Sequence, residues 1–364
     1  MRIGIFGGAF NPPHIGHVQA AKTAVLQNEI ELLLVIPTGT PPHKELPPGT
    51  PNPEARLAMT KNAFNSSNKI KVSDIEIFSN ERNYTIDTIS KIKHKYPGSE
   101  ILLLVGTDMF DMLSTWKDSE NLLRTVTPVL LPRDVIKISS SDIRKMLPLR
   151  EGNEFLTDTN YSYIIKHRIY NAKPNWDWLR EKAHSMLSPL RIPHVEACEA
   201  EAIRLAEHWG VNSDDAREAA ILHDITKKLD FSQNMCIIAK HGVSVGELGN
   251  HGEKLLHSIT GALLAQSEFG VSNAVADAIK WHTTGRAKMS MLEKVIYIAD
   301  YIESTRDFPG VDDLRKAAYE NIDNAMIIGL EMTVEDLKAR GIDPDCTTYE
   351  AISDLRDSSQ TGNP

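Results

Sequence analysis

The sequence predicts an α/β unit with a parallel sheet, followed by an all-α unit. Three observations support this fold class. Short apolar runs alternate with amphipathic helical patterns in the first half of the chain, which is typical of a parallel sheet covered by helices. After Lys173-Pro174-Asn175 only helical patterns follow. A chain of 364 residues is also long enough for two domains.

The first unit is expected to contain four strands, each an apolar run that ends in turn-forming residues. The strands are predicted at Arg2–Phe6, Glu31–Pro37, Ile70–Ile77 and Ile101–Val105, and the helices at Val18–Leu26, Pro53–Phe64, Tyr84–Lys95 and Asn160–Tyr170. In such a sheet, ligands bind beyond the carboxyl ends of the strands. These ends are therefore where a site is expected.

The second unit is expected to be helical from Trp176 onward, with clear patterns at Val195–Trp209 and Asp214–Leu229. Pro174 discourages a helix from running through the joint between the units. The expected parts are a first domain over residues 1–172, a second over residues 173–340 and a polar C-terminal tail over residues 341–364.

The composition excludes some partners and favours others. A net charge of −9 argues against broad binding of nucleic acid or of an acidic membrane, so any polyanion has to be held by local basic groups. The three cysteines are too few and too far apart for a disulfide framework or a cysteine zinc site. The N-terminus lacks the basic region of a signal peptide, and no apolar run is long enough to span a bilayer. We expect a cytoplasmic protein whose partners are small phosphorylated molecules, and the sequence leaves homo-oligomers open.

The stretch Gly7–His17 connects the first expected strand to the first helix. Gly7 and Gly8 let the backbone approach a ligand closely, and the helix start offers free N–H groups and the positive end of the helix dipole. His14 and His17 lie on one face of the first turn. The combination predicts a phosphate-binding turn, and the alternative is an ordinary connection with two surface histidines.

Polar residues also follow the other strand ends. The second strand leads into a proline-rich loop that ends in Lys44, and the fourth leads into Gly106 and Asp108. Further on, Ser139–Ser141 form a hydroxyl-rich helix start with Arg144 one turn in, which can direct amides, hydroxyls and a guanidinium at one anion. Taken separately, the proline-rich loop could be a solvated connection and the serine-rich segment a plain helix cap.

Taken together, the motifs G-G-x-F-N-P-P-H-x-G-H, P-P-H-K, N-Y-T-I-D-T, G-T-D and S-S-S-x-I-R resemble the nicotinate mononucleotide adenylyltransferase family of H-x-G-H nucleotidyltransferases. The resemblance covers Met1 to about Ala172 and implies a Rossmann-like fold. It also implies adenylyl transfer from ATP, accompanied by Mg²⁺, to nicotinate mononucleotide, which yields deamido-NAD and pyrophosphate as a step of NAD biosynthesis. Asn11 departs mildly from the family, in which many members carry aspartate at this place.

By position, the resemblance implies a role for each matching residue. ATP would be bound by His14, His17, Ser140 and Arg144, a phosphate by Lys44, and the nicotinate end by Thr85 and Trp116. The expected nucleotide-binding set is completed by Gly7, Gly8, Phe10, Gly106, Asp108 and Ser139. Because the attacking phosphate monoester is already ionised at neutral pH, the task is alignment and charge stabilisation, without a general base. The nicotinamide form of the nucleotide, or another acceptor such as pantetheine phosphate, stays open.

In the second half, histidine and aspartate occupy positions where the helical pattern expects apolar residues. His223 comes four residues after Ala219 and is followed by Asp224, and Asp300 comes four residues after Ile296. A buried carboxylate is costly without a partner, and a metal ion supplies one. A single core histidine would need no such explanation, but the spread over one helical unit favours a metal centre. The candidate ligands are His194, His223, Asp224, His257, His282 and Asp300.

This order, with Lys227 completing H-D-x-x-K, resembles the HD phosphohydrolase superfamily. The segments around His282 and Asp300 resemble its subgroup that cleaves diadenosine tetraphosphate symmetrically into two ADP. The resemblance covers about Ile192 to Arg315. It implies that Asp224 bridges two metal ions and that Lys227 steadies the charge. The first ion would be bound by His194, His223, Asp224 and Asp300, and a second beside His257 and His282.

Two interpretations of the second half differ in class. In the first, it hydrolyses dinucleoside polyphosphates, so that the chain is a bifunctional enzyme. Nitrogen and oxygen ligands suit iron, manganese or cobalt, and the sequence does not choose among them. In the second interpretation it is a catalytically silent regulator that binds nucleotides, although a binding module has no need for a complete ligand set plus Lys227.

Overall fold

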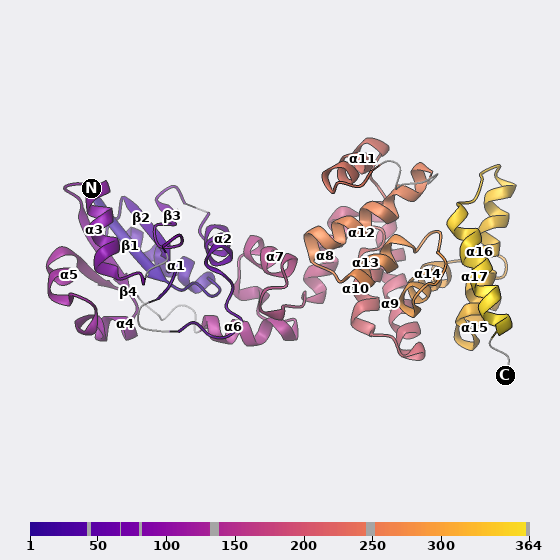
Figure 1. Ribbon diagram of the computed structural model, residues 1–364, viewed down its shortest axis with the longest axis horizontal. Coiled ribbons are helices and arrows are strands. Elements are labelled where there is room, and N and C mark those ends of the chain that lie inside the picture. Colours follow the sequence, from indigo (N-terminus) through magenta and orange to yellow (C-terminus); the bar gives the residue numbers. More distant parts are fainter. Residues whose placement is uncertain (42–44, 66, 80–81, 132–137, 245–251, 362–364) are drawn as a thin grey trace. The chain divides into compact units, whose positions relative to one another are not determined.

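The computed structural model describes residues 1–364 except 42–44, 66, 80–81, 132–137, 245–251 and 362–364, and without the side chains of residues 359–361. The chain divides into two compact units, Met1–Asn175 and Trp176–Pro364. The first contains a sheet covered by helices, and the second is helical (Figure 1). The predicted fold class is confirmed.

A five-stranded parallel sheet forms the centre of the first unit, in the order β3-β2-β1-β4-β5. Its strands are β1 (Arg2–Gly8), β2 (Leu32–Pro37), β3 (Ile70–Val72), β4 (Glu100–Val105) and β5 (Thr127–Leu130). The helices of this unit are α1 (Ile15–Gln27), α2 (Pro53–Ala63), α3 (Thr85–Lys95), α4 (Thr107–Asp111), α5 (Ser119–Thr125), α6 (Ser140–Met146) and α7 (Asp158–Lys166). Because the strand order reverses at β1, the carboxyl ends of β1 and β4 form the switch point where such sheets bind ligands.

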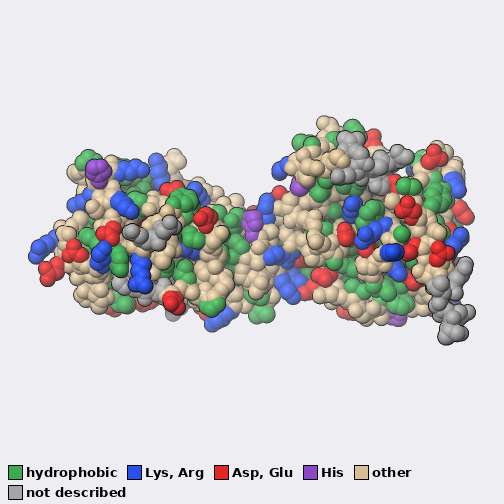
Figure 2. Space-filling model, viewed as in Figure 1, with side chains coloured by type: hydrophobic (Ala, Val, Ile, Leu, Met, Phe, Trp, Pro, Cys, Tyr) green, Lys and Arg blue, Asp and Glu red, His purple; other side chains and the backbone are tan. Residues whose placement is uncertain are grey.

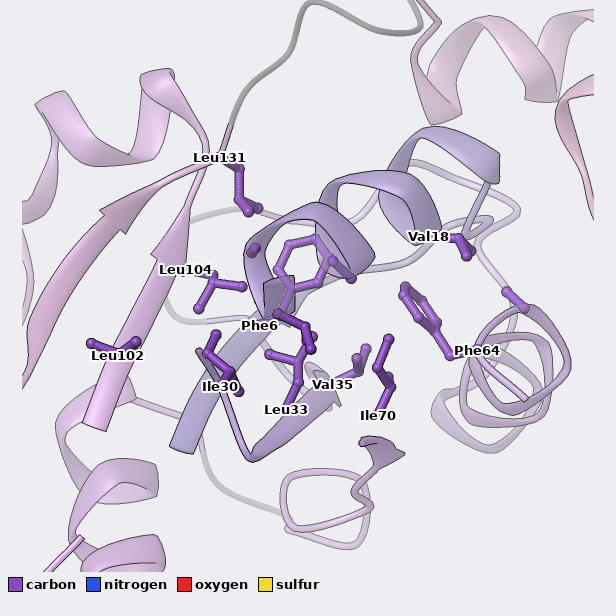
Figure 3. Close-up of a cluster of buried hydrophobic side chains, with 14 of the residues drawn as sticks. Phe6, Val18, Ile30, Leu33, Val35, Phe64, Ile70, Leu102, Leu104 and Leu131 are labelled. Carbon is purple, nitrogen blue, oxygen red and sulfur yellow. The ribbon is translucent and has the colours of Figure 1, made fainter. Parts of the chain in front are cut away.

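The strand side chains alternate between the two faces of the sheet, and helices cover both faces. Phe6, Leu33 and Leu104 belong to one cluster, where they pack with residues of α1 and α2 (Figure 3). Ile5 and Leu103 belong to the other cluster, with residues of α3 and α5. Both faces of these strands are therefore apolar, which explains why the strands appear in the sequence as continuous apolar runs.

Two strands differ from the sequence prediction. β3 ends at Val72, so the remaining residues of the predicted strand Ile70–Ile77 lie in a loop and a turn. No strand is predicted from the sequence at β5, because this element is short and contains Pro128. Proline cannot donate a hydrogen bond to a neighbouring strand, and β5 accommodates it because it lies at the edge of the sheet.

The second unit is helical throughout the part that the structure describes, apart from its connecting turns. Its helices are α8 (Trp176–Met186), α9 (Ile192–Trp209), α10 (Ser213–Leu222), α11 (Phe231–Lys240), α12 (Leu256–Phe269), α13 (Asn273–Lys280), α14 (Met291–Ile302), α15 (Val311–Glu320), α16 (Ile322–Ala339) and α17 (Cys346–Thr361). Helix α10 ends at Leu222 and not at the predicted Leu229, and the chain turns there. A Cβ atom on Gly261 of α12 would come within 3.3 Å of the His223 carbonyl oxygen, so glycine permits the close approach of α12 to this turn.

The end of the chain also differs from expectation. Residues 341–364 are predicted to be a tail, but the structure places α17 within them. Ala351, Ile352 and Leu355 of this helix are buried, and α17 packs against α16. The apolar stripe is narrow, and the polar residues around it dominate the composition of the segment.

Charged side chains of both signs are interspersed on the visible surface of each unit (Figure 2). An anion site on such a surface has to be formed by a few local groups. None of the helices in the described parts of the chain has the length and hydropathy that a bilayer crossing requires.

Two candidate active sites

A cavity of about 760 Å³ lies at the switch point of the sheet in the first unit. Its walls include Gly7 and Gly8 at the end of β1, Gly106 after β4, Thr85 at the start of α3, and Trp116. Among the described residues, no heavy atom lies within 4 Å of the place where a Cβ atom on Gly7 would be, so a side chain there would occupy open space. A cavity of this size accommodates a nucleotide-sized ligand.

His14 and His17 lie at the start of α1. The backbone N–H of His14 donates to Nδ1 of His17 at 3.2 Å, so the proton of neutral His17 lies on Nε2. Burial lowers the pKa of His14 to about 4 and the pKa of His17 to about 3, and for His17 the neighbouring His14 adds to the effect. Both rings are therefore neutral at pH 7. At a helix N-terminus they can donate N–H hydrogen bonds to an anion without carrying a positive charge.

The loop before His14 is held by residues that are far away in the sequence. The Ser140 hydroxyl donates to the Pro12 carbonyl at 2.8 Å, and Nη1 of Arg144 donates to the Asn11 carbonyl at 2.5 Å. The Tyr170 hydroxyl donates to Oδ1 of Asn11 at 2.6 Å. The serine-rich start of α6 thus lies against the stretch Gly7–His17. A single anion site formed by both segments would require this contact.

Arg56 of α2 connects the loops that follow β1 and β2. Its guanidinium is buried and donates to three backbone carbonyls, those of Ala9 at 3.0 Å, Thr38 at 2.6 Å and Gly39 at 2.9 Å. Hydrogen bonds from a charged donor to backbone acceptors are among the stronger ones. Arg56 therefore fixes the two loops that border the cavity.

Glu76 is a buried carboxyl in the wall of this cavity. It accepts a hydrogen bond from the Thr88 hydroxyl at 2.7 Å. Burial raises the pKa of Glu76 to about 7, although the Thr88 hydrogen bond and the charge of Lys91 lower it in part. The cavity thus contains an acid that is partly protonated near neutral pH.

A second cluster of polar side chains lies in the helical unit. His194 comes from the start of α9, His223 and Asp224 from the turn after α10, and Asp300 from α14. Nε2 of His194 lies 3.3 Å from Nε2 of His223 and 3.0 Å from Oδ1 of Asp300. Oδ2 of Asp224 lies 3.5 Å from Nε2 of His223. These four residues form the first half of the cluster.

His257 at the start of α12 and His282 after α13 form the second half. Their Nε2 atoms lie 3.3 Å apart. Oδ1 of Asp224 lies 3.3 Å from Nε2 of His257 and 3.6 Å from Nε2 of His282. Asp224 is fully buried and directs one carboxylate oxygen to each pair of histidines.

The outer ring nitrogens of these histidines decide what the inner ones can do. Nδ1 of His223, His257 and His282 each lies within 2.7 Å of a backbone carbonyl oxygen, and Nδ1 of His194 lies 3.0 Å from Oε1 of Glu303. With the proton on Nδ1, the Nε2 lone pairs face one another and the carboxylates. Such an arrangement fits a cation at its centre, and the pattern of outer acceptors is that of metal-binding histidines.

The burial of Asp224 supports the same conclusion. Its Oδ1 atom is buried and makes no hydrogen bond with any residue that the structure describes. Burial alone would disfavour the ionised carboxyl, but contacts with His223 hold the pKa of Asp224 well below its usual range. A buried, ionised and underbonded carboxylate beside imidazole lone pairs fits a metal ion.

Three cations contact this cluster. Nε and Nη2 of Arg191 each lie 2.5 Å from Oδ2 of Asp224, and Nη2 of Arg306 lies 2.8 Å from Oδ1 of Asp300. Nζ of Lys227 lies 2.9 Å from Nε2 of His257. Positively charged side chains therefore lie next to both carboxylates and next to His257.

Two families match the chain. The family described as cytidylyltransferase-like matches residues 5–146, and the HD domain family matches residues 191–305. A "Probable nicotinate-nucleotide adenylyltransferase" of Shouchella clausii is 35% identical over 173 residues, which are 48% of this chain and 86% of that protein. The chain belongs to the nicotinate-nucleotide adenylyltransferase family. Its second unit is an HD domain, and we refer to the two units as the adenylyltransferase domain and the HD domain.

Other relatives cover the HD domain or both domains. The "Bis(5'-nucleosyl)-tetraphosphatase, symmetrical" of Bacillus subtilis is 42% identical over 149 residues, which are 41% of this chain and 80% of that protein. A "Probable nicotinate-nucleotide adenylyltransferase/Ap4A hydrolase" of Mycoplasma genitalium is 29% identical over 346 residues, which are 91% of this chain and 97% of that protein. The chain is thus similar to a relative over nearly its whole length, across both domains.

The structure brings most of the residues predicted for the adenylyltransferase site to two places. Gly7, Gly8, Thr85, Gly106 and Trp116 line the cavity. Beside the Gly-rich turn lie His14, His17, Ser140 and Arg144.

Three predicted residues lie elsewhere, and one lies outside the described residues. Phe10 is buried in the core with the centroid of its ring 5.3 Å from that of His17. Its side chain therefore packs against the first turn of α1 and does not line the cavity. Ser139 caps α6 by accepting from the Asp142 N–H. Asp108 is exposed on the short helix α4, and Lys44 lies outside the described residues.

In the HD domain the structure brings all six predicted ligands and Lys227 into one cluster. Sequence reasoning missed Arg191, Glu303 and Arg306 there, and Arg56 and Glu76 in the adenylyltransferase domain. Glu303 had one signal, because it lies three residues after Asp300 and hence on the same face of the chain. Glu76 lies within the run predicted as a strand, where an acidic residue has no special meaning.

Proposed function

We propose that the chain is a bifunctional enzyme. The adenylyltransferase domain transfers the adenylyl group of ATP to nicotinate mononucleotide and releases deamido-NAD and pyrophosphate. The HD domain hydrolyses diadenosine tetraphosphate to two ADP. The observation that supports two activities is the presence of two separate sites, one at the switch point of the sheet and one among the HD helices.

In the proposed transfer, an oxygen of the nicotinate mononucleotide phosphate bonds to the α-phosphorus of ATP, and the bond from that phosphorus to the bridging oxygen breaks. The attacking oxygen is ionised, so no proton has to be removed from it. His14 and His17 donate N–H hydrogen bonds to the ATP phosphates, and Arg144 and Lys44 add positive charge. Mg²⁺ bound with ATP would neutralise charge on the departing pyrophosphate. Thr85 and Trp116 receive the nicotinate end, and the cavity walls exclude water.

In the proposed hydrolysis, water adds to one of the two central phosphorus atoms, the central P–O–P linkage breaks, and each half leaves as ADP. The metal ligands would be His194, His223, Asp224, His257, His282 and Asp300. One or two ions of iron, manganese or cobalt would activate water and neutralise phosphate charge when bound. Lys227 steadies the charge on the phosphate, and Glu303 holds the His194 ring in place.

The transfer reaction is tested by comparing acceptors. Purified protein is incubated with Mg²⁺, ATP and either nicotinate mononucleotide, nicotinamide mononucleotide or pantetheine phosphate, and the products are separated by chromatography. We expect deamido-NAD and pyrophosphate in equal amounts, with the highest rate for nicotinate mononucleotide. A higher rate with pantetheine phosphate would contradict the proposed acceptor.

The hydrolase reaction is tested by metal analysis together with a turnover assay. The metal content of the purified protein is measured, and protein loaded with iron, manganese or cobalt is incubated with diadenosine tetraphosphate. We expect ADP as the only nucleotide product. ATP and AMP in equal amounts would indicate asymmetrical cleavage, and no hydrolysis with any of the three metals would favour the regulatory interpretation.

A further inference from the structure

Three cationic side chains lie between the HD ligands and the solvent. The side chains of Arg191, Lys227 and Arg306 are 26%, 40% and 34% exposed. The ligands that they contact are more buried, since Asp224 is 0% and Asp300 is 16% exposed. We call these three residues the cationic rim. A ligand that approaches Asp224 and Asp300 from this side passes the rim.

The two arginines of the rim are held in place, yet each has one free end. Arg306 donates from Nε to the Asp300 carbonyl at 2.9 Å and from Nη2 to Oδ1 of Asp300 at 2.8 Å. Arg315 donates to the Arg306 carbonyl at 2.9 Å and fixes its backbone. Arg191 contacts Asp224 through Nε and Nη2. Among the described residues, Nη1 of Arg191 and of Arg306 has no hydrogen-bond partner, and both are available to a ligand.

Metal ions at the cluster would change what these arginines bind. The carboxylates of Asp224 and Asp300 would then be neutralised by the ions, so their attraction for the guanidinium groups would fall. A guanidinium released from a carboxylate is best satisfied by a phosphate, which it binds through two parallel N–H donors. A chain of several phosphates offers one group to the metal centre and further groups to the rim, whereas a single phosphate reaches only the centre.

We propose that Arg191 and Arg306 bind the phosphate groups on either side of the cleaved linkage and make the HD site selective for polyphosphate chains over single phosphates. This inference rests on the proposed hydrolase function and specifies its substrate class. The two arginines are binding residues, which do not hold the metal ions themselves.

The test measures binding without turnover. Metal-loaded protein is titrated by calorimetry with inorganic tripolyphosphate and, separately, with orthophosphate. In the variants Arg191→Met and Arg306→Met we expect tripolyphosphate affinity to fall by about 10- to 100-fold, the range for loss of charge-assisted hydrogen bonds. Metal content should stay unchanged, and orthophosphate affinity should change by less than about 3-fold. The variant Arg340→Met is the control, because Arg340 pairs with Asp336 at the end of α16.

The outcomes separate this inference from the proposed function. Unchanged tripolyphosphate affinity in both variants would overturn the inference, and so would an equal loss for orthophosphate or a loss of bound metal. If tripolyphosphate binding depends on the arginines while wild-type protein leaves diadenosine tetraphosphate intact, phosphate binding by the cationic rim is supported and the proposed hydrolase function is contradicted. Partial recovery of affinity in Arg306→Lys would support a charge contact with the chain.

Discussion

The two domains use histidine in opposite electrostatic surroundings. His14 and His17 lie against each other, His17 also lies against the Phe10 ring, and burial lowers the pKa of His14 to about 4 and of His17 to about 3. The HD histidines instead face Asp224 and Asp300, and an acceptor occupies each Nδ1. The difference teaches that the partners of the two ring nitrogens decide the role. In the first domain the ring is a neutral donor, and in the second it can offer the lone pair of Nε2 to a cation.

The largest effect is expected from Asp224→Ala, which should abolish the activity of the HD domain and leave that of the adenylyltransferase domain. The change removes the carboxylate that faces both pairs of HD histidines. Hydrolysis of diadenosine tetraphosphate should fall by roughly 10³-fold or more, because a direct ligand is lost. The measurement is ADP formation together with the metal content of the variant.

The control for Asp224→Ala is the other activity of the same protein sample. Transfer of the adenylyl group should keep its wild-type rate, which would also show that the adenylyltransferase domain is folded, and the helical circular dichroism signal should match wild type, since Asp224 lies in the helical unit. Undiminished hydrolysis in this variant would contradict the metal assignment.

His17→Ala should produce the converse result. Loss of one donor to a charged transition state lowers turnover by about 10²- to 10³-fold, so adenylyl transfer should fall by this factor while hydrolysis is unchanged. The ratio of the wild-type rate to the His17→Ala rate should not decrease between pH 6 and pH 8, since His17 with a pKa of about 3 is neutral throughout this range, and the ratio cancels any effect of Glu76, whose pKa is about 7. A ratio that falls as pH rises through 6.5 would show that the histidine acts as a cation, and a near-normal rate in His17→Ala would contradict the assignment.

Some residues of the HD cluster could be singled out in the sequence because a histidine or an aspartate stands where the helical pattern expects an apolar residue. A His or Asp at such a position is costly to bury, so the sequence itself marks His223, Asp224 and Asp300 as unusual. Arg191 and Arg306 could not be found in this way. Arginine is common on surfaces, and only the folded chain shows that these two contact buried carboxylates.

The fold was predictable where burial is strong and local. The runs that form β1, β2 and β4 are apolar on both faces and stand out in the sequence. β5 and α17 were not predictable, since an edge strand with Pro128 and a helix with a narrow buried stripe depend on neighbours that only the tertiary structure supplies. The same is true of Arg56, whose partners are backbone carbonyls of two loops.

Glu303→Gln should have a smaller effect than loss of a direct ligand. Oε1 of Glu303 lies 3.0 Å from Nδ1 of His194, and the carboxylate also accepts from the Thr305 hydroxyl at 2.6 Å. An outer partner of this kind typically changes metal affinity by about 10- to 100-fold. We expect weaker metal binding in a competition with a chelator, while hydrolysis at saturating metal stays close to wild type.

Glu201→Gln provides the matched control for Glu303→Gln. Glu201 is a buried glutamate on the same helix as His194, and it accepts from the Tyr319 hydroxyl at 2.7 Å. Its substitution should leave metal affinity unchanged. Equal weakening in both variants would mean that the HD fold, and not the orientation of His194, controls the metal.

The smallest effect is expected from a substitution of Glu76, which allows the buried carboxyls of the two domains to be compared in the same way as their histidines. Contacts with His223 hold the pKa of Asp224 low, whereas burial raises the pKa of Glu76 from 4.5 to about 7. The folded state therefore binds the Glu76 proton more tightly than the unfolded state does. The contribution of Glu76 to the free energy of unfolding is highest below pH 4.5, decreases between about pH 4.5 and pH 7, and is constant above.

Glu76→Gln removes this titration and should stabilise the adenylyltransferase domain at pH 8 by on the order of 2 kcal/mol relative to wild type, with little change at pH 5. Hydrogen exchange of the amides in β1 and β4 at the two pH values measures the effect in this domain alone. The exposed Glu120→Gln variant on α5 serves as the control and should shift neither value. An equal shift at pH 5 and pH 8 would show that the Glu76→Gln substitution acts through packing. A shift confined to high pH would show that Glu76, whose carboxyl accepts a side-chain hydrogen bond from the Thr88 hydroxyl, resists ionisation. Asp224 of the HD domain contrasts with it, because its carboxylate lies against His223 and the Arg191 guanidinium.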